Sequence, residues 1–88
     1  MNINEYRKEI DEIDSAMLSL FEKRMETAAK IGKYKKENAI PIKNTDRERE
    51  LLQKICEKAD PELSAYARRL FSLLIELSSE YQVNLNIN

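Results

Sequence analysis

The chain has 88 residues, of which 42% are hydrophobic and 35% charged, and its 15 basic and 16 acidic side chains leave a net charge of −1. This length predicts a single domain, residues 1–88, with a core so modest that an oligomer is favoured. The near-neutral charge argues against nucleic acid as a partner, because binding it requires a basic excess on one face.

Residue types that often perform chemistry are scarce. The chain has no histidine and one cysteine, Cys56. It therefore has no Cys–His or Ser–His pair and no internal disulfide, and we expect neither a metal nor a cofactor. The sequence shows no signal peptide and no run approaching the ~18 apolar residues of a membrane span. We expect a soluble cytoplasmic protein with no membrane partner.

Residues 4–38 are predicted to form one long helix. Asn4 is the expected N-cap, and Pro41 ends the helix near Asn38 because proline disfavours helical geometry in the residue before it. Gly32, the only glycine, could instead break the helix, but no proline or turn cluster accompanies it. Apolar residues recur in steps of three and four, as on one helical face: Ile3, Tyr6, Ile10, Ile13, Met17, Leu20, Thr27 or Ala28, Ile31 and Tyr34.

The predicted helix is too long for a compact monomer. About 35 residues make a rod of roughly 50 Å, whereas a compact chain of this size would be only about 30 Å across. One end of the rod would therefore lack a core. Pairing with a second copy of the chain is the simplest remedy.

A connector and a second helix follow. The connector covers about residues 39–45, and the second helix runs from about residue 46 to 59. Asn44 or Thr45 can cap this helix, and Thr45 with Glu48 three residues later is typical of a capping box.

A third helix completes the chain. Asp60 followed by Pro61 is a helix start signal, with Asp60 as N-cap and Pro61 at the first helical position. We expect this helix to run to about Asn84 and the tail, residues 84–88, to be frayed. The expected main apolar stripe of this helix comprises Leu63, Ala67, Leu70, Leu74, Leu77 and Tyr81. A parallel row beside the stripe comprises Phe71, Ser78 and Gln82. The fold class is all-α, with three helices and a long first one.

Polar side chains on or beside the apolar faces form a distinct set. A buried cation costs several kcal/mol unless a negative group meets it, so each could simply extend to solvent or pair with an acid. Together, however, they carry a net positive charge and suit a small ligand with two carboxylates, because arginine pairs bidentately with a carboxylate. An enzyme with this set would act by positioning and fixed charge, as in a unimolecular rearrangement of a dianion. The set comprises Arg7, Arg24, Lys35, Arg47, Glu48, Ser78 and Gln82.

Five segments in order resemble the all-helical chorismate mutase family, the AroQ type. They are Arg7 within YRKEIDEID, Arg24 within LFEKRMETAAKIGKYK, Pro41 in the connector, DRERELL at 46–52 and RLFSLLIELSSEYQ at 69–82. IDxID alone is a weak signal, whereas the five in register are a strong one and cover almost the whole chain.

The resemblance implies an intertwined homodimer of three-helix chains, whose long first helices cross between subunits. It implies conversion of chorismate, a small dicarboxylate, to prephenate by a Claisen rearrangement on the shikimate-pathway route to phenylalanine and tyrosine. Each of two equivalent sites would take most residues from one chain and Arg7 from the other.

The resemblance also implies residue roles. Arg24 and the partner's Arg7 would clamp the two carboxylates, with Arg47 supporting that network and Ser78 donating to a carboxylate. Lys35 and Gln82 would face the ether oxygen, which gains negative charge as its C–O bond breaks, and so bind the transition state better than the ground state.

Two further positions complete the implied site. Glu48 matches a carboxylate that accepts from the substrate hydroxyl. Asn44 stands where an aspartate is common, and it can serve through its backbone. Gln82 replaces the glutamate of some members, which predicts no need for acid pH, because an amide donates without being protonated.

Two other functions remain open. An isochorismate-pyruvate lyase shares the fold and the basic pocket, although RERELL and the pair Ser78 and Gln82 favour the mutase. A non-catalytic helical dimerisation or regulatory module is the alternative from another class. Substrate turnover distinguishes all three.

Overall fold

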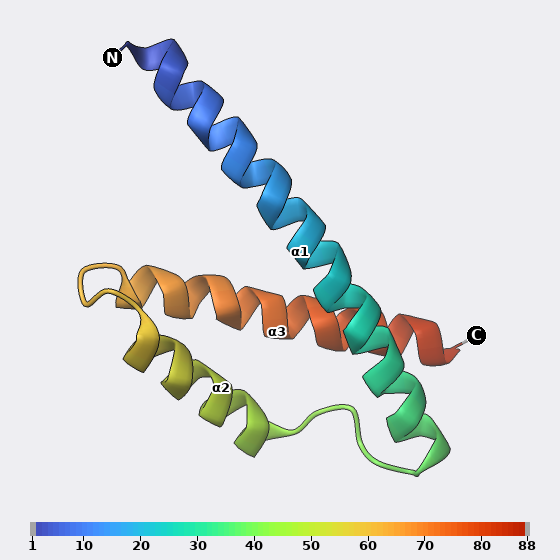
Figure 1. Ribbon diagram of the computed structural model, residues 1–88. Helices are drawn as coiled ribbons and strands as arrows, with labels where there is room; N and C mark the ends of the chain where they lie inside the picture. The colour runs from blue at the N-terminus through green and yellow to red at the C-terminus, as the bar shows by residue number, and fades with distance from the viewer. Residues whose placement is uncertain (1, 88) are drawn as a thin grey trace.

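The computed structural model describes residues 2–87, and the side chains of residues 2–85. It contains three helices: α1 (Ile3–Glu37), α2 (Thr45–Lys58) and α3 (Ser64–Ile87) (Figure 1). The predicted all-α class and long first helix are confirmed. Gly32 does not break α1, which continues through it as one helix of 35 residues.

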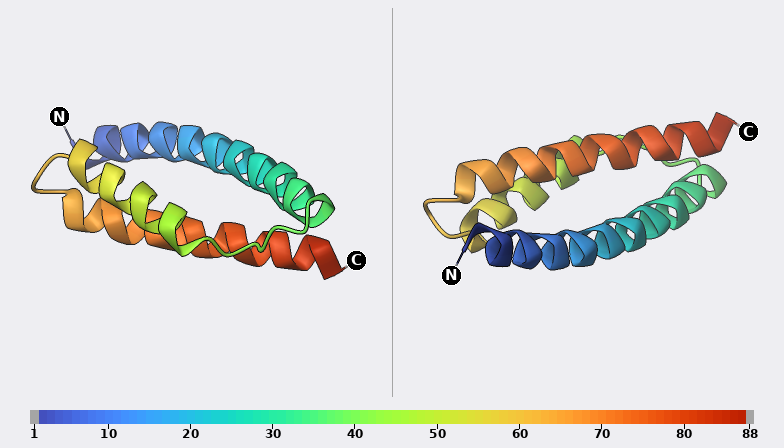
Figure 2. Two further views of the ribbon diagram at one scale, coloured as in Figure 1. Left: turned by 90° about the horizontal axis from the view of Figure 1, so that it is seen from below. Right: turned by 90° about the horizontal axis from the view of Figure 1, so that it is seen from above.

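Helix α3 is the centre of the arrangement. It packs against both α1 and α2, whereas α1 and α2 do not pack against each other within residues 2–87. Figure 1 shows α1 crossing α3 with its C-terminal half, so that its N-terminal half extends away from the other helices. Figure 2 shows the two chain ends at opposite ends of the molecule.

The single chain is extended and poorly buried. Its radius of gyration is 16.1 Å and its long axis 55 Å, against about 12 Å for a compact chain of this length. Its accessible surface is 7351 Å², whereas a folded monomer of this mass exposes roughly 5,400 Å². The excess of about 2,000 Å² is of the size that one subunit buries in an obligate dimer.

The surplus surface includes the apolar stripe on the N-terminal half of α1. Every residue from 2 to 20 is exposed. The stripe residues there are each 50–64% exposed: Ile3, Tyr6, Ile10, Ile13, Met17 and Leu20. The chain by itself therefore gives this half of α1 no core.

The start of α1 differs from the prediction. Asn2, and not Asn4, is the N-cap: its side chain accepts from the Glu5 backbone N–H at 3.1 Å, and the Glu5 carboxylate accepts from the Asn2 backbone N–H at 3.3 Å. This reciprocal capping box satisfies two N–H groups that the first turn leaves without helical partners. Glu5 is the partner that makes Asn2 the better cap.

The starts of α2 and α3 agree only in part with the prediction. Asn44, one of the two predicted caps, caps α2, whose first residue is Thr45, whereas the predicted box between Thr45 and Glu48 does not form. At Asp60 the chain makes a turn, because the Asp60 carboxylate accepts from the backbone N–H of Glu62. Helix α3 therefore begins at Ser64, past the predicted start at Pro61, and it continues to Ile87. The helix thus extends past the expected end at about Asn84, fraying of the tail stays a prediction, and residue 88 lies outside the described residues.

The backbone at the C-terminal end of α1 sets the direction in which the connector leaves the helix. The backbone N–H of Ile40 donates to the Lys35 carbonyl at 2.8 Å, and that of Ala39 donates to the Lys36 carbonyl at 3.4 Å. These bonds form a Schellman motif, whose turning residue is left-handed. Ala39 occupies that position with φ 52°, where glycine is usual. After this turn the connector runs past Lys35, whose ammonium contacts the Ile42 carbonyl, to the start of α2.

The most buried face of α3 is not the predicted main stripe. Leu63 and Leu70 of that stripe are 57% and 43% exposed, whereas Gln82, from the row beside it, is only 7% exposed. Within the single chain, the row that contains Gln82 faces α1, and part of the predicted main stripe is not packed against another helix. No helix within residues 2–87 is long and apolar enough to cross a membrane.

Candidate active site

A pocket of about 370 Å³ lies between the C-terminal half of α1, the start of α2 and the C-terminal half of α3. This volume suits a small organic ligand. The pocket brings together all but one of the polar residues selected from the sequence: Arg24, Lys35, Asn44, Arg47, Glu48, Ser78 and Gln82. Apolar side chains, including Ile31, Leu51 and Ile75, complete the wall.

Arg24 crosses from α1 to α3. Its Nη1 donates to the Ser78 hydroxyl at 2.5 Å and to the Leu74 carbonyl at 3.4 Å, while that hydroxyl donates to the same carbonyl at 2.8 Å. Arg24 and Ser78 are both half-buried. Ser78 thus fixes one side of a guanidinium group whose remaining N–H groups can bind an anion.

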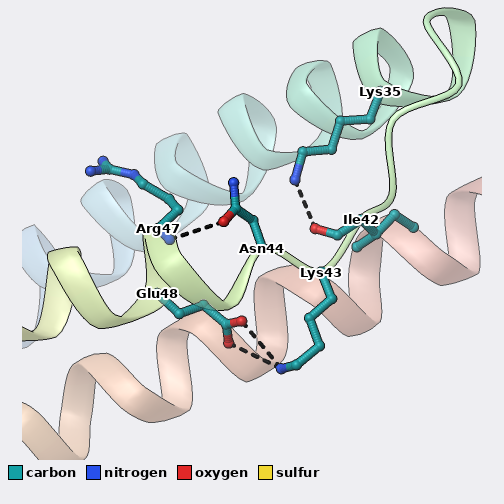
Figure 3. Close-up of polar contacts among 6 residues, drawn as sticks. All are labelled: Lys35, Ile42, Lys43, Asn44, Arg47 and Glu48. Carbon is teal, nitrogen blue, oxygen red and sulfur yellow. Dashed lines mark hydrogen bonds and ion pairs between the residues drawn. The ribbon is translucent and has the colours of Figure 1, made fainter.

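Lys35 reaches from α1 to the connector. Its ammonium donates to the Ile42 carbonyl at 2.7 Å, and Figure 3 shows the side chain extended towards that carbonyl. An ammonium has three N–H donors, so two remain for a ligand. The Schellman turn at the end of α1 places the connector where it can hold this half-buried lysine.

The two half-buried cations of the pocket are paired only with neutral groups. Within residues 2–87, neither Arg24 nor Lys35 forms an ion pair with a carboxylate, and each hydrogen-bonds to hydroxyl or carbonyl oxygens instead. Uncompensated cations in a partly desolvated site attract anions more strongly than exposed ones do. The pocket is therefore electrostatically prepared for an anionic ligand.

Arg47 and Glu48 have partners outside the centre of the pocket. Arg47 pairs with Glu50 at 3.5 Å, and Figure 3 shows its guanidinium directed away from Lys35. The pKa of Glu50 is lowered, chiefly by the hydrogen bond from Lys54 and the charge of that lysine, with Arg47 adding to the effect. Glu48 pairs with Lys43 at 3.2 Å.

Asn44 and Gln82 are held by backbone groups. The Asn44 side-chain oxygen accepts from the Arg47 backbone N–H at 3.0 Å, which leaves its amide NH₂ at the pocket (Figure 3). Gln82 Nε2 donates to the Ala28 carbonyl at 2.8 Å. That bond uses one of two N–H groups, so the second remains for a ligand.

Arg7 is the predicted site residue that the chain does not bring to the pocket. It lies about 26 Å from Arg24 along α1, at ~1.5 Å per residue, and it is exposed. A side chain cannot span that distance. The Arg7 of the same chain therefore takes no part in this pocket.

An apolar groove of about 440 Å³ adjoins the pocket at Arg24. Its wall comes from the middle of α1 and from α3: Met17, Leu18, Leu20, Phe21, Arg24, Leu70, Phe71 and Leu74. Arg24 is common to the groove and the pocket, so a segment seated in the groove would end beside the cationic site.

Besides the Leu74 carbonyl described above, three further supporting groups were not identified from the sequence. They are the carbonyls of Ala28 and Ile42 and the ammonium of Lys43, which contact Gln82, Lys35 and Glu48 respectively. Backbone carbonyls carry no side-chain signature, and Lys43 is one exposed lysine among many. No group of three or more potential metal-ligating His, Cys, Asp or Glu residues occurs in the described part of the chain.

Known proteins are similar to this chain in sequence. The family described as "Chorismate mutase type II" matches residues 6–83. The chain is 38% identical over 72 residues to a bifunctional chorismate mutase/prephenate dehydratase of Escherichia coli strain K12, covering 80% of this chain and 19% of that protein. It is 31% identical over 81 residues to a chorismate mutase of Methanocaldococcus jannaschii, covering 89% of this chain and 81% of that protein.

A solved structure is also similar. A conserved hypothetical protein from Pyrococcus furiosus has 39% sequence identity and a TM-score of 0.76, covering 91% of this chain and 93% of that one. The chain spans about a fifth of the length of the bifunctional relatives that it matches. With its three helices, its cationic pocket and a family match across residues 6–83, the chain belongs to the type II chorismate mutase family.

Proposed function

We propose that this domain is a chorismate mutase, an isomerase that converts chorismate to prephenate. The observation that carries the proposal is the pairing of Arg24 and Lys35 with neutral groups only, in one pocket of about 370 Å³. A dicarboxylate supplies the negative charge that these cations lack. The family membership and the chorismate mutase named among the relatives support the same reaction.

The proposed chemistry is a unimolecular rearrangement. One C–O bond of the enolpyruvyl ether breaks as a C–C bond forms to the ring, so no proton, electron or co-reactant is exchanged. Negative charge builds on the ether oxygen in the transition state. Lys35 and the second N–H of Gln82 stabilise that charge, and because both groups are already held in place, little reorganisation is needed during the reaction.

The remaining pocket residues orient the substrate. Arg24, fixed by Ser78, binds a carboxylate, and the Glu48 carboxylate accepts from the substrate hydroxyl after turning from Lys43. Asn44 contributes its amide, and Arg47 adds positive charge at the rim. This binding holds the reacting carbons close together and so lowers the entropic part of the barrier.

The active unit in this proposal is an intertwined homodimer. The exposed stripe of α1 has the length and the apolar character to enter the groove of a second copy, where it would cover surface beside Arg24. The partner's Arg7 then reaches the second carboxylate of the substrate. This arrangement accounts for the excess exposed surface and for the distance between Arg7 and the pocket of its own chain.

The test is incubation of the purified protein with chorismate at neutral pH, with chorismate loss followed by absorbance and the product identified by chromatography. We expect prephenate. Chorismate that stays intact, under conditions where the protein is a folded dimer, would contradict the proposal and favour a non-catalytic module. Incubation with isochorismate tests the lyase, whose products would be salicylate and pyruvate.

A further inference from the structure

Helices α1 and α3 are in close contact at Gly32. Gly32 and Ala28, one turn apart, are the buried residues of α1, and they face the buried side chain of Gln82. A Cβ atom added at Gly32 would lie 2.9 Å from Gln82 Cγ and 3.2 Å from Gln82 Cβ. Non-bonded carbon atoms do not pack closer than 3.0 Å, so a side chain at position 32 must displace Gln82 or separate the two helices.

The displaced atoms would be Cβ and Cγ of Gln82, and their position determines where the side-chain amide lies. Cγ and Cβ are not the flexible end of this side chain, and the amide is anchored by its 2.8 Å bond to the Ala28 carbonyl. Rotation about the Cα–Cβ bond, or a separation of the two helices, would break this anchor. A methyl group at position 32 therefore acts on the amide through the base of the same side chain.

We propose that Gly32 is a positioning residue for the Gln82 amide. The absence of a side chain lets α3 come close enough for one N–H of the amide to bond to the Ala28 carbonyl and for the other to face the pocket. The glycine has no role in turning the chain, because α1 is helical throughout and the only positive φ in residues 2–87 is that of Ala39. This inference rests on the proposed function for its effect on turnover, but not for its effect on the amide.

The experiment compares four proteins: wild type, Gly32→Ala, Gln82→Ala and the double variant. Shortening Gln82 to alanine removes the Cγ and Cδ neighbours of position 32, so that of its three nearest atoms the Cβ at 3.2 Å remains. We expect Gly32→Ala alone to lower kcat by roughly 10- to 100-fold, as expected for misplacement of a reacting group by about 1 Å. KM should change much less, because the amide acts mainly in the transition state.

In the Gln82→Ala background, the same glycine substitution should lower kcat by less than about threefold, because groups that act as a unit are non-additive. Wild-type kcat in Gly32→Ala, or an equal loss in both backgrounds, would overturn the inference. Lys33→Ala is the matched control at the adjacent exposed position, where we expect kcat within about twofold of wild type.

A second readout does not depend on turnover. In ¹⁵N-labelled protein, the side-chain NH₂ signals of Gln82 are assigned by their loss in Gln82→Ala. We expect Gly32→Ala to shift both signals and to speed their exchange with water as the bond to Ala28 breaks. Unchanged signals would overturn the inference, even if the wild type proved inactive on chorismate, whereas shifted signals in an inactive protein would uphold it and reject the proposed function alone.

The melting temperature covers the case in which Gly32→Ala unfolds the protein. Alanine is the better helix former, so any loss of stability must come from crowding at the crossing. We expect Gly32→Ala to lower Tm more when position 82 is glutamine than when it is alanine. Equal falls in both backgrounds would place the crowding elsewhere and contradict the inference.

Discussion

The two halves of α1 use the same helical geometry for opposite purposes. The C-terminal half crosses α3 through small buried residues, Ala28 and Gly32, and presents Arg24 and Lys35 to a pocket. The N-terminal half carries a regular apolar stripe that is at least half exposed along its length. We call the C-terminal half the complete half, because it packs against α3 of its own chain. The N-terminal half is the incomplete half, because no other helix within residues 2–87 packs over its apolar face.

This difference indicates which properties belong to one chain and which need two. The hydrogen bonds that hold Arg24, Lys35 and Gln82 all come from the same chain, so the cationic pocket forms within it. Burial of the stripe, and delivery of an arginine from its far end, are what the proposed dimer would add.

The largest effect is expected from a charge placed in the stripe. Ile10→Asp puts a carboxylate where the proposed dimer buries an apolar side chain, which costs several kcal/mol. We expect loss of the dimer and of all measurable mutase activity. Sedimentation velocity gives the mass, and circular dichroism gives the remaining helicity.

Ser15→Asp is the matched control for this substitution. It adds the same charge to the same exposed half of α1 but lies outside the stripe. We expect it to remain dimeric and active. A dimeric, active Ile10→Asp variant would show that the stripe is not an interface.

The next effect is expected in the complete half. Lys35→Ala removes an ammonium that is held by the Ile42 carbonyl and faces the pocket. We expect kcat to fall by roughly 10²- to 10³-fold, as for loss of one oxyanion donor, with a circular dichroism spectrum like that of the wild type. Lys30→Ala, at an exposed position of the same helix, should keep its activity. Equal activity in both variants would remove Lys35 from the mechanism.

The sequence allowed the helices to be predicted more reliably than their ends. Apolar spacing indicates α1, because a face that needs burial leaves a period of three to four residues. Caps depend on local competition between similar residues. Asn2 is favoured over Asn4 because Glu5 completes its box, and Asp60 binds the N–H of Glu62 in a turn before α3 starts.

The pocket residues were predictable as a set, but not their supports. Polar residues on an apolar face are visible in sequence, and six of the seven selected in that way line one pocket, together with Asn44, which the family resemblance added. Which carbonyl holds Lys35, and which residue of α3 meets Gly32, depend on the path of the connector and on the helix crossing. Neither is encoded in a local pattern. The roles assigned to the pocket residues stay predictions.

A smaller effect is expected at the crossing of α1 and α3. Gln82→Glu places a carboxyl group in a site that is 7% exposed and faces the Ala28 carbonyl. Burial and that carbonyl both raise the pKa of the new group. Only its protonated form can donate, so kcat should be roughly tenfold low or worse at neutral pH and should recover as the pH falls through the raised pKa. A pH profile parallel to that of the wild type would contradict donation by this side chain.

The smallest effect concerns the turn that ends the complete half. Ala39 has φ 52°, a conformation that costs an L-residue about 1–2 kcal/mol and glycine little. After the larger unfolded-state entropy of glycine is subtracted, Ala39→Gly should stabilise the protein by about 0.5–1 kcal/mol. Urea unfolding at one fixed protein concentration measures it. An unchanged or lower midpoint would mean that the left-handed turn is not the preferred state of the connector.

Subunit mixing tests most directly whether the incomplete half of α1 completes the pocket of a second copy. Arg7→Ala and Arg24→Ala should each be nearly inactive alone. Unfolded and refolded together, they should form mixed dimers with one site that keeps both arginines and one that keeps neither. Random pairing then predicts recovery of about a quarter of wild-type activity, whereas a mixture no more active than either variant alone would contradict the shared site.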